Sequence, residues 1–347
     1  MDTAPIRPDE RFDEARVADY LRAHLPELVG DGEIDFEQFP GGKANLTYLA
    51  RCGDTELVLR RPPLGPVAPG AHDMAREHRV LAVLHEAYPK APRAYLFCED
   101  PEVMGKQFFV MERRHGHVVR DAWPEEIGAD DDFRRAVGEN LVDALAELHL
   151  VDHVALGLGD LGRPDGFVER QVAGWTDRWQ RARDADIPAM DEVARRLAVG
   201  VPEPQSAALL HNDFKLDNTM IDEAGSIVAV FDWDMSTTGD PLVDLGTTLA
   251  YWSGGGLASF AAADSVVLGD VFGPEDIAQR YAAATGFDLD GIDWYRSLGL
   301  FRIAVIVQQI YIRWVRGQTR DERFAGLGAL VPPMAEAALD LLQPQSR

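Results

Sequence analysis

The N-terminal third of the chain alternates between helical and strand-like patterns. Apolar residues recur at helical spacing over residues 12–28, and glycines at positions 30 and 32 end this pattern. Short runs of apolar residues follow, separated by Pro-Gly-Gly and Gly-Asp turns. We therefore predict one amphipathic helix and then an antiparallel meander of three strands, at residues 34–39, 46–52 and 56–60.

A second helix and two more strands complete this small sheet domain. Residues 73–88 carry apolar side chains at helix-compatible positions, and strand-like runs follow at residues 94–98 and 107–111. After Gly116 the pattern changes to longer helices, of which residues 133–149 are the clearest. We predict three parts: an N-terminal nucleotide-binding lobe over residues 1–111, a hinge over residues 112–116, and a C-terminal catalytic and substrate-binding lobe over residues 117–347.

The second part is mainly helical. Helical patterns lie near residues 174–197, 241–252 and 296–316, and a strand-loop-strand unit occupies residues 207–234. A small antiparallel sheet with a helix, followed by a helical region that carries an inserted hairpin, indicates an α+β fold. We expect a cleft between the two lobes, and ligands favour such clefts.

The composition predicts a soluble cytoplasmic protein. The 347 residues are 46% hydrophobic and 27% charged, which is enough apolar sequence to bury at least one large core. No run of 18 consecutive apolar residues occurs, and the acidic, polar N-terminus differs from a signal peptide. Cys52 and Cys98 are the only cysteines, too few for a disulfide framework and without the spacing of a zinc site.

The chain is strongly acidic. It has 34 basic and 58 acidic residues and a formal net charge of -24, and the excess of acid is spread along the sequence. This charge disfavours nonspecific binding to nucleic acid or to an anionic membrane, so we expect neither as a partner. It also repels a polyphosphate nucleotide at long range, so a nucleotide site in this chain must supply local cations and a metal ion.

The most informative segment is the polar run HNDFKLDN at residues 211–218. A turn and an apolar strand follow it, and the strand ends in Asp232-Trp233-Asp234, so two acidic clusters flank a short hairpin. Phosphoryl transfer needs a carboxylate that orients the attacking hydroxyl, and oxygen ligands that hold magnesium against the triphosphate. The hairpin brings such groups within reach of one another, which predicts a phosphotransferase that uses ATP and Mg²⁺.

The same segment resembles the catalytic loop of the aminoglycoside phosphotransferase-like branch of the protein-kinase superfamily. That loop carries His-x-Asp, with Asn five residues beyond the Asp, and then a strand that ends in Asp. The resemblance implies that Asp213 is the catalytic base and that Asn218 and Asp232 bind magnesium. It also implies that His211 braces the loop, and we count Lys215 among the catalytic candidates. The implied fold is two-lobed and protein-kinase-like.

Two further acids lie beside these candidates. Asp217 and Asp234 are open to two interpretations, contact with a second magnesium ion or an ordinary solvated position, and Asp234 is also a candidate substrate contact. Asp and Asn are common in turns for local hydrogen-bonding reasons, so the whole segment has a purely structural alternative. The ordered pairing of the two motifs favours the catalytic interpretation.

The loop between the first two predicted strands is the candidate phosphate-binding loop. Its glycines permit a close approach of the backbone to phosphate, although a Pro-Gly-Gly sequence alone is typical of an ordinary hairpin turn. The family has Gly-Gly followed by Asn in its nucleotide loop. The resemblance therefore implies a nucleotide site at Gly41, Gly42, Lys43 and Asn45, with Lys43 supplying positive charge.

Arg60 occupies the strand position at which the superfamily places a lysine that contacts phosphates and pairs with a helix glutamate. Glu77 is the matching acid, and arginine suits a bidentate pair with its planar carboxylate. Because arginine does not reproduce a compact ammonium, the pair either grips phosphate or only orients the helix. Arg61 is a spare candidate for the phosphate contact, and two unpaired surface charges are the alternative.

Two other segments gain roles from the resemblance. At the hinge, the carbonyl of Glu112 and the amide of Arg114 are implied to bind the adenine edge. Asp240 and Asp244 resemble the family's Asp-Pro-x-x-Asp segment, in which the second acid opens a helix and braces the catalytic loop. An acid at a helix N-terminus also needs no function beyond capping, so both are predicted to be structural.

The sequence disfavours three rival functions. A haloacid-dehalogenase-like phosphatase with Asp232 as nucleophile needs a downstream lysine, and no lysine follows Lys215. A nucleotide-binding pseudokinase is suggested by Arg60, but the catalytic-loop residues are intact. A protein kinase needs a long peptide-binding activation loop, and only a few residues separate Asp232 from Asp240.

The acceptor is predicted to be a small molecule with a hydroxyl group. The loop GGKANLTY, the strand VLR and the segment FDWDMSTTGDP most resemble kinase-like domains fused to, or encoded near, acyl-CoA dehydrogenases, which implies a hydroxy acid or hydroxyacyl-CoA. An aminoglycoside, another antibiotic or a sugar is the alternative, because an acidic cleft suits polycations. Arg313 is the main candidate substrate contact, and Trp175 and Trp252 are weaker candidates for lining the site.

Overall fold

The computed structural model divides the chain into two units. Unit 1 contains Met1–His115 and Val228–Ser236, and unit 2 contains Gly116–Ile227 and Thr237–Arg347. Residues 228–236, which the sequence pattern groups with the C-terminal lobe, thus pack with unit 1. The structure describes residues 2–40, 45–65, 72–120, 122–125, 127–252, 268, 271–319 and 321–343.

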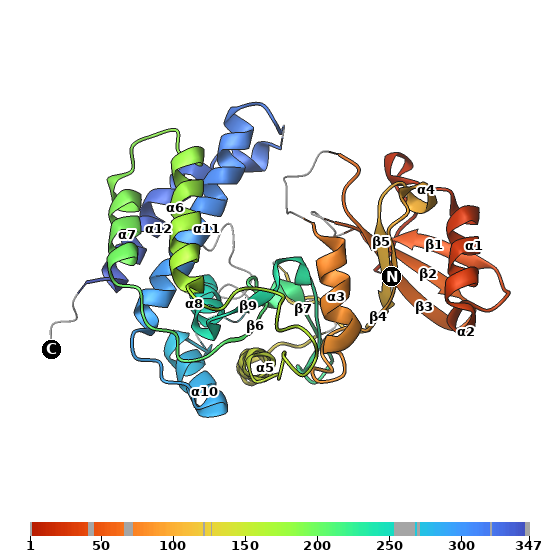
Figure 1. The fold of residues 1–347 in the computed structure, drawn as a ribbon, viewed down its shortest axis with the longest axis horizontal. Coiled ribbons are helices and arrows are strands. Elements are labelled where there is room, and N and C mark those ends of the chain that lie inside the picture. Colours follow the sequence, from red (N-terminus) through yellow and green to blue (C-terminus); the bar gives the residue numbers. More distant parts are fainter. Residues whose placement is uncertain are drawn as a thin grey trace. The chain divides into compact units, whose positions relative to one another are not determined.

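Unit 1 is built on a five-stranded antiparallel sheet with strand order β1-β2-β3-β5-β4 (Figure 1). The first three strands pair in sequence order, which confirms the predicted meander. The register of β2 and β3 places Thr47 opposite Arg60. The strands are β1 (Ile34–Gln38), β2 (Leu46–Cys52), β3 (Thr55–Arg61), β4 (Ala94–Cys98) and β5 (Phe108–Glu112).

Helices cover both faces of this sheet. Figure 1 shows α1 on one side of the sheet and α3 on the other. Because side chains alternate along a strand, Leu57, Leu59 and Arg61 of β3 face α1, whereas Val58 and Arg60 face α3. The helices of unit 1 are α1 (Glu14–His24), α2 (Pro26–Val29), α3 (Met74–Leu84) and α4 (Pro101–Met104).

The single helix predicted over residues 12–28 was wrong in one respect, because a break divides it at Pro26. Leu25 leaves the helical conformation, with φ -130° and ψ 45°, and α2 begins at Pro26. Proline has no N–H to continue the helical hydrogen bonds, and its ring disfavours the helical conformation of the residue before it.

Residues 228–236 join unit 1 because they pack on α3 and on the turn that follows it. The N–H of Val230, in β8 (Ile227–Val230), donates to the carbonyl of Lys90 at 2.8 Å. Trp233 is fully buried against Tyr88, with ring centroids 6.1 Å apart. Truncation of a buried tryptophan to alanine typically lowers the free energy of unfolding by about 3–5 kcal/mol, so this contact stabilises the position of residues 228–236.

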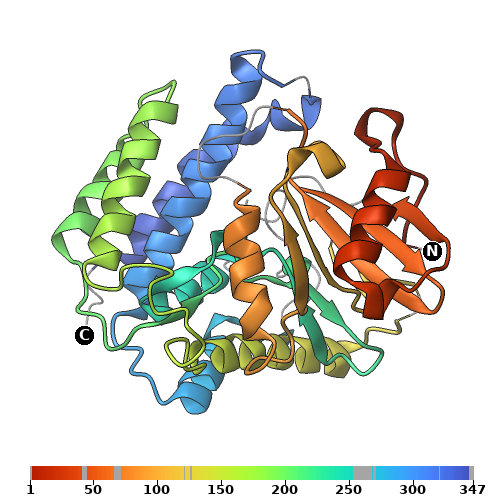
Figure 2. The ribbon, with the colours of Figure 1, turned by 45° about the vertical axis from the view of Figure 1, so that its right-hand side comes forward.

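Unit 2 is mainly helical, as predicted. Its longest helix, α11, packs against α6, α7, α8 and α12 (Figure 2). The helices are α5 (Asp131–His149), α6 (Phe167–Ala182), α7 (Pro188–Val199), α8 (Pro241–Trp252), α10 (Pro274–Thr285), α11 (Ile292–Val315) and α12 (Val331–Leu341), and the short strands are β6 (Ala208–Leu210), β7 (Thr219–Ile221) and β9 (Thr237–Gly239). The antiparallel sheet of unit 1 and the helices of unit 2 confirm the α+β class.

Two glycines let the backbones of α8 and α11 approach closely. A Cβ atom on Gly246 of α8 would lie 2.4 Å from the carbonyl oxygen of Tyr295, and one on Gly299 of α11 would lie 2.6 Å from the carbonyl oxygen of Gly246. Neither obstacle is a flexible side-chain end, so a larger residue would force the helices apart. The close packing places polar residues of both helices beside the loop at residues 211–218.

We predict that Gly246→Ala lowers the free energy of unfolding by about 1–3 kcal/mol, the usual cost of overpacking a core. Gly174→Ala is the matched control, because Gly174 lies in α6 and a Cβ there would meet nothing within 4 Å. The control is expected to gain about 0.5–1 kcal/mol from the higher helix propensity of alanine. Urea unfolding of both variants measures the difference, and equal stability of the two would contradict the close-packing argument.

Two segments are apolar and long enough to cross a membrane by length and composition alone, Ile292–Val315 and Glu322–Leu341. In the first, 61% of the apolar window is buried inside the protein, as in the core helix of a globular domain, and in the second 28% is buried.

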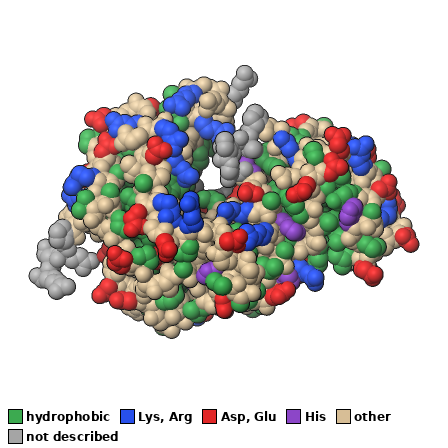
Figure 3. Space-filling model, in the orientation of Figure 1, with side chains coloured by type: hydrophobic (Ala, Val, Ile, Leu, Met, Phe, Trp, Pro, Cys, Tyr) green, Lys and Arg blue, Asp and Glu red, His purple; other side chains and the backbone are tan. Residues whose placement is uncertain are grey.

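On the face drawn in Figure 3, acidic side chains are scattered with basic ones among them and do not form a single patch.

Candidate active site

The loop that follows β6 is held in an unusual conformation. Asn212 has φ 68°, in the left-handed region that non-glycine residues seldom adopt, although asparagine tolerates it better than most. Asp244, at the start of α8, accepts hydrogen bonds from the N–H of His211 at 2.6 Å and of Asn212 at 2.7 Å. The strained turn, which costs on the order of 1–3 kcal/mol, is thus stabilised by one buried carboxylate.

Arg302 of α11 holds the same turn from its carbonyl side. Its guanidinium donates to the carbonyl oxygen of Asn212 at 3.2 Å and to Oγ1 of Thr247 at 3.0 Å. Its side chain is buried, with 3% of the residue exposed, and burial lowers its pKa although Asp244, Tyr251 and Asp213 oppose this effect. Asp244 and Arg302 therefore grip the peptide groups immediately before Asp213.

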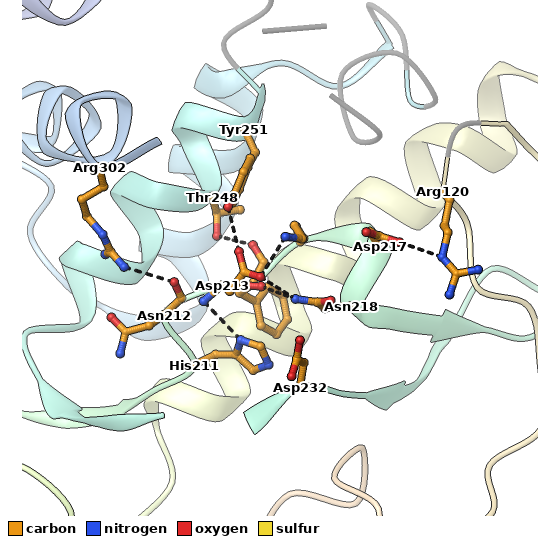
Figure 4. A network of polar contacts seen from close by, with 12 residues as sticks. Arg120, His211, Asn212, Asp213, Asp217, Asn218, Asp232, Thr248, Tyr251 and Arg302 are labelled. Carbon is orange, nitrogen blue, oxygen red and sulfur yellow. Dashed lines mark hydrogen bonds and ion pairs between the residues drawn. The ribbon is translucent and has the colours of Figure 1, made fainter. Parts of the chain in front are cut away.

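The Asp213 carboxylate receives donors on both oxygens (Figure 4). Oδ1 accepts from the Tyr251 hydroxyl at 2.7 Å, and Oδ2 accepts from Nζ of Lys215 at 2.8 Å and from Nδ2 of Asn218 at 2.9 Å. Burial alone would raise the pKa of Asp213, but Lys215 and the Tyr251 hydroxyl hold it below its usual range. The group is therefore a carboxylate at neutral pH.

Two histidines complete the support of this loop. His211 is fully buried, and its Nδ1 accepts the N–H of Asp213 at 3.3 Å. His149 lies between Asp244, 3.3 Å from its Nε2, and the Tyr281 hydroxyl, 2.6 Å from its Nδ1. His211 thus contacts the backbone of its own loop, and its bracing role stays a prediction.

The helix α8 supplies most of the contacts to the loop. Its polar residues repeat at helical spacing, so they share the face that meets the loop: Asp244 binds the backbone at 211–212, Thr248 donates to the carbonyl of Phe214 at 3.0 Å, and Tyr251 reaches Asp213. Sequence reasoning missed Thr248, Tyr251 and Arg302. The available signal was a polar residue in an otherwise apolar helix, since a buried polar group has to find a partner.

Three further predicted site residues, Arg60, Glu77 and Asp232, lie in unit 1 and contact one another there. Nε of Arg60 donates to Glu77 at 3.0 Å, and its terminal NH2 pairs with Oδ1 of Asp232. The expected bidentate pair is thus divided between two carboxylates. Glu77 is 1% exposed and also accepts the N–H of Trp233 at 3.3 Å, so the alternative of two surface charges is wrong. Burial raises the pKa of Glu77, and Arg60 opposes this rise.

Arg61 is not a spare phosphate contact. Because neighbouring residues of a strand face opposite sides, Arg61 points into the α1 side of the sheet, away from Glu77. It is 1% exposed and donates to the carbonyl oxygens of Met104 and Glu10 and to the Tyr48 hydroxyl, the last two at 2.6 Å. Arg61 is a core residue.

Asn218 of unit 2 and Asp232 of unit 1 each carry a side-chain oxygen of the kind that magnesium prefers, and their role as metal ligands stays a prediction. Nδ2 of Asn218 is committed to Asp213, and Oδ1 of Asp232 is committed to Arg60, so the remaining oxygen of each side chain is the atom that could bind a cation. Magnesium prefers oxygen ligands and takes only one or two from a protein when phosphates supply the rest. Within the described ranges, no group of three or more His, Cys, Asp or Glu residues could hold a metal ion.

The hinge residues are tied to the turn at residues 89–93. The N–H of Glu112 donates to the carbonyl of Arg93 at 2.8 Å, and its Oε2 accepts the N–H of Arg93 at 3.1 Å. The guanidinium of Arg114 donates to the carbonyls of Pro89 and Ala91 at 2.9 and 3.2 Å. These side chains fix the hinge backbone, and binding of adenine by that backbone stays a prediction.

The candidate phosphate loop is only partly visible. Gly41, Gly42 and Lys43 lie outside the described residues. Asn45 precedes β2 and is 3% exposed, and neither polar atom of its amide has a hydrogen-bond partner in the part of the chain that the structure describes. A buried amide without a protein partner is uncommon, so its surroundings differ from those of an ordinary turn residue.

The candidate substrate contacts are dispersed. Arg313 is exposed in the last turn of α11, about 16 Å along the helix axis from Arg302. Trp175 is nearer to the loop, since the guanidinium of Arg302 lies 5.3 Å from its ring centroid. Trp252 is buried and donates to the carbonyl of Phe272 at 3.0 Å, and Asp234 lies in a short 3₁₀ helix of unit 1. The structure therefore offers Trp175 and Arg302 beside the loop and does not place Arg313 there.

Known proteins similar in sequence to this chain are phosphotransferases and acyl-CoA dehydrogenase family members. The sequence profile described as the phosphotransferase enzyme family matches residues 35–285. Acyl-CoA dehydrogenase family member 11 of Gallus gallus is 32% identical over 349 residues, which cover 98% of this chain but only 44% of that protein. This chain therefore spans less than half the length of that curated relative.

Two solved structures resemble this one. A protein of Ralstonia eutropha JMP134, described provisionally as an aminoglycoside phosphotransferase, has a TM-score of 0.81 and 30% identity, over 96% of this chain and 98% of that one. Aminoglycoside phosphotransferase APH(4)-Ia, in a ternary complex with ADP and hygromycin B, has a TM-score of 0.58 and 18% identity over 91% and 98% of the two chains, and so shows a shared fold. These findings confirm the resemblance inferred from the catalytic-loop motif, and the chain belongs to the phosphotransferase enzyme family.

Proposed function

We propose that the chain is an ATP- and magnesium-dependent phosphotransferase that moves the γ-phosphoryl group to a hydroxyl of a small molecule. The observation that carries this proposal is the Asp213 carboxylate, which is kept anionic beside Lys215. Hydrogen bonds from the preceding backbone to Asp244 and from Arg302 to that backbone fix its position. A fixed carboxylate is the group that phosphoryl transfer requires from the protein. Family membership supports the same reaction type.

In the proposed mechanism, Asp213 orients the acceptor hydroxyl and takes its proton as the oxygen bonds to the γ-phosphorus. The bond between the γ-phosphorus and the bridging oxygen of ADP breaks in the same in-line displacement, so no covalent phosphoenzyme forms. Lys215 and Asn218 hold the carboxylate in position from Oδ2. Magnesium, held by Asn218 and Asp232, would neutralise the charge of the phosphates.

Arg60 is proposed to act mainly by placing Asp232. Its guanidinium is shared between Glu77 and Asp232, so it links the helix acid to the proposed metal ligand. In this role an arginine can replace the usual lysine and the enzyme can remain active, even if the arginine makes no contact with phosphate. Pseudokinase behaviour is the alternative, and the arginine is the observation that favours it.

The acceptor is proposed to be a hydroxy acid or a hydroxyacyl-CoA. The support is that a relative over 98% of this chain carries the name of an acyl-CoA dehydrogenase family member. An aminoglycoside or other antibiotic is the second candidate, because APH(4)-Ia was solved with hygromycin B. A cytoplasmic location, without nucleic acid or membrane as partner, also belongs to this proposal, and the charge of -24 supports it.

The test is ATP consumption with magnesium across hydroxy acids, hydroxyacyl-CoA thioesters, aminoglycosides and sugars, with Asp213→Ala as the blank. Turnover with one class of acceptor, absent in the variant, would establish the reaction and the substrate class together. Binding of ATP without transfer to any acceptor would favour the pseudokinase alternative, and Arg60→Lys would then be the variant to examine.

A further inference from the structure

The two oxygens of Asp213 are unequally occupied. Oδ2 accepts from Lys215 and from Asn218, whereas Oδ1 accepts from Tyr251 alone among the described residues. Each oxygen of a carboxylate can accept about two hydrogen bonds. Oδ2 is therefore filled by the protein, and Oδ1 retains one position.

We propose that the acceptor hydroxyl is received at Oδ1 of Asp213, beside the Tyr251 hydroxyl, and that Tyr251 is the residue that positions the acceptor. This inference rests on the proposed phosphotransferase function and adds to it a named oxygen and a named neighbour. A hydroxyl that donates to Oδ1 lies next to the phenol, because both are held by the same atom. Figure 4 shows Tyr251 directed at Asp213 from the side opposite His211.

Tyr251 is well placed to act as a rigid wall of the acceptor position. It is 6% exposed, it lies in a helix whose residues are all buried, and Nζ of Lys215 lies 5.2 Å from its ring centroid. Burial and the neighbouring Asp213 raise the pKa of its hydroxyl, which therefore remains a hydrogen-bond donor. A fixed donor leaves Oδ1 one direction in which to accept a second hydroxyl.

Removing the phenolic hydroxyl should admit water to that position. In Tyr251→Phe the ring is kept, Oδ1 loses the one donor that it has among the described residues, and a space the size of one oxygen opens beside the base. Water can then donate to Oδ1 in place of the acceptor and attack the γ-phosphorus. Its proton passes to Asp213, the bond between the γ-phosphorus and the bridging oxygen of ADP breaks, and ADP and inorganic phosphate leave. The enzyme is expected to hydrolyse ATP at the expense of transfer.

The measurement is the ratio of phosphorylated product to ADP formed, together with the KM values of acceptor and of MgATP. For Tyr251→Phe we expect the ratio to fall and the acceptor KM to rise, each by about tenfold, as for loss of a hydrogen bond to a charged group. The KM of MgATP should stay unchanged. Tyr251→His retains a donor at this place and should restore part of the ratio.

Tyr295→Phe is the matched control. The Tyr295 hydroxyl donates to Oδ2 of Asp240 at 2.6 Å, so this variant also removes a buried phenol-to-carboxylate hydrogen bond from unit 2. It should lower the melting temperature without changing the ratio. Equal effects of Tyr251→Phe and Tyr295→Phe on the ratio, or no effect of Tyr251→Phe on an active enzyme, would overturn the inference alone, whereas absence of transfer by the wild type would overturn the proposed function with it.

Discussion

Asp213→Asn is expected to slow phosphoryl transfer by about 10²–10⁴-fold, the range that general-base catalysis contributes, while MgATP still binds. Asparagine has the same shape as aspartate but cannot take up the proton of the acceptor hydroxyl. The loop around it should persist, because Asp244 and Arg302 hold its backbone independently of the Asp213 side chain. Initial rates with the best acceptor, and calorimetric titration with a non-hydrolysable ATP analogue, measure the two effects.

Asp232→Asn supplies the contrast. Asp232 is the proposed metal ligand of unit 1 and the partner of Arg60, so its neutral variant should weaken nucleotide binding in the presence of magnesium. The loss should disappear when both proteins are titrated with nucleotide in EDTA, where the metal no longer contributes. If both variants lose nucleotide affinity equally, the roles assigned to Asp213 and Asp232 are wrong.

The candidate residues that the sequence motif grouped together are those set by local spacing. Asp213, Lys215 and Asn218 lie within six residues of one another, so a single loop conformation brings their side chains together. The pairing of Arg60 with Glu77, 17 residues apart in the chain, was implied by the resemblance to the superfamily's strand lysine and helix glutamate. Motif spacing carries this kind of information without any knowledge of how helices pack.

Contacts that depend on packing were missed. Tyr251 is 38 residues from Asp213, and Arg302 is 90 residues from Asn212, so their approach depends on how α8 and α11 pack on the loop. The glycines at 246 and 299 that permit this packing give no pattern in sequence that distinguishes them from other glycines. Arg302 did give a signal, because a charge within an apolar helical run has to be paired if that helix is buried.

The alternation of side chains along a strand separates Arg61 from Arg60. Side chains alternate along a strand, so two adjacent arginines cannot both face the helix that carries Glu77. The face assignment itself required the structure, in which Arg60 meets Glu77 and Arg61 enters the α1 side. Pro26 is a similar case, since proline disfavours continuation of a helix and the single helix predicted over residues 12–28 did not take it into account.

Arg302→Met is expected to lower kcat by about 10–100-fold without a matching loss of stability. The variant removes both hydrogen bonds that Arg302 donates, so the carbonyl of Asn212 loses its donor and Asp213 is expected to shift. A misplacement of a catalytic group by about 1 Å can lower the rate on the order of 10²-fold. Methionine fills a similar volume and avoids the cost of burying a cation, so the stability change should be small. Steady-state kinetics and thermal melts measure the two quantities.

Arg296→Met is the control on the same helix, because Arg296 pairs with Asp293 at 3.0 Å and does not enter the loop network. Hydrogen exchange of the peptide at residues 209–218 adds a readout that needs no activity: it should become faster in Arg302→Met and stay unchanged in Arg296→Met. Arg302→Lys should be intermediate, since one ammonium keeps the charge but does not reproduce the planar fork that reaches both Asn212 and Thr247. A fall in melting temperature with an unchanged rate per folded molecule would instead make Arg302 a packing residue, and the left-handed turn at Asn212 would then be held by Asp244 alone.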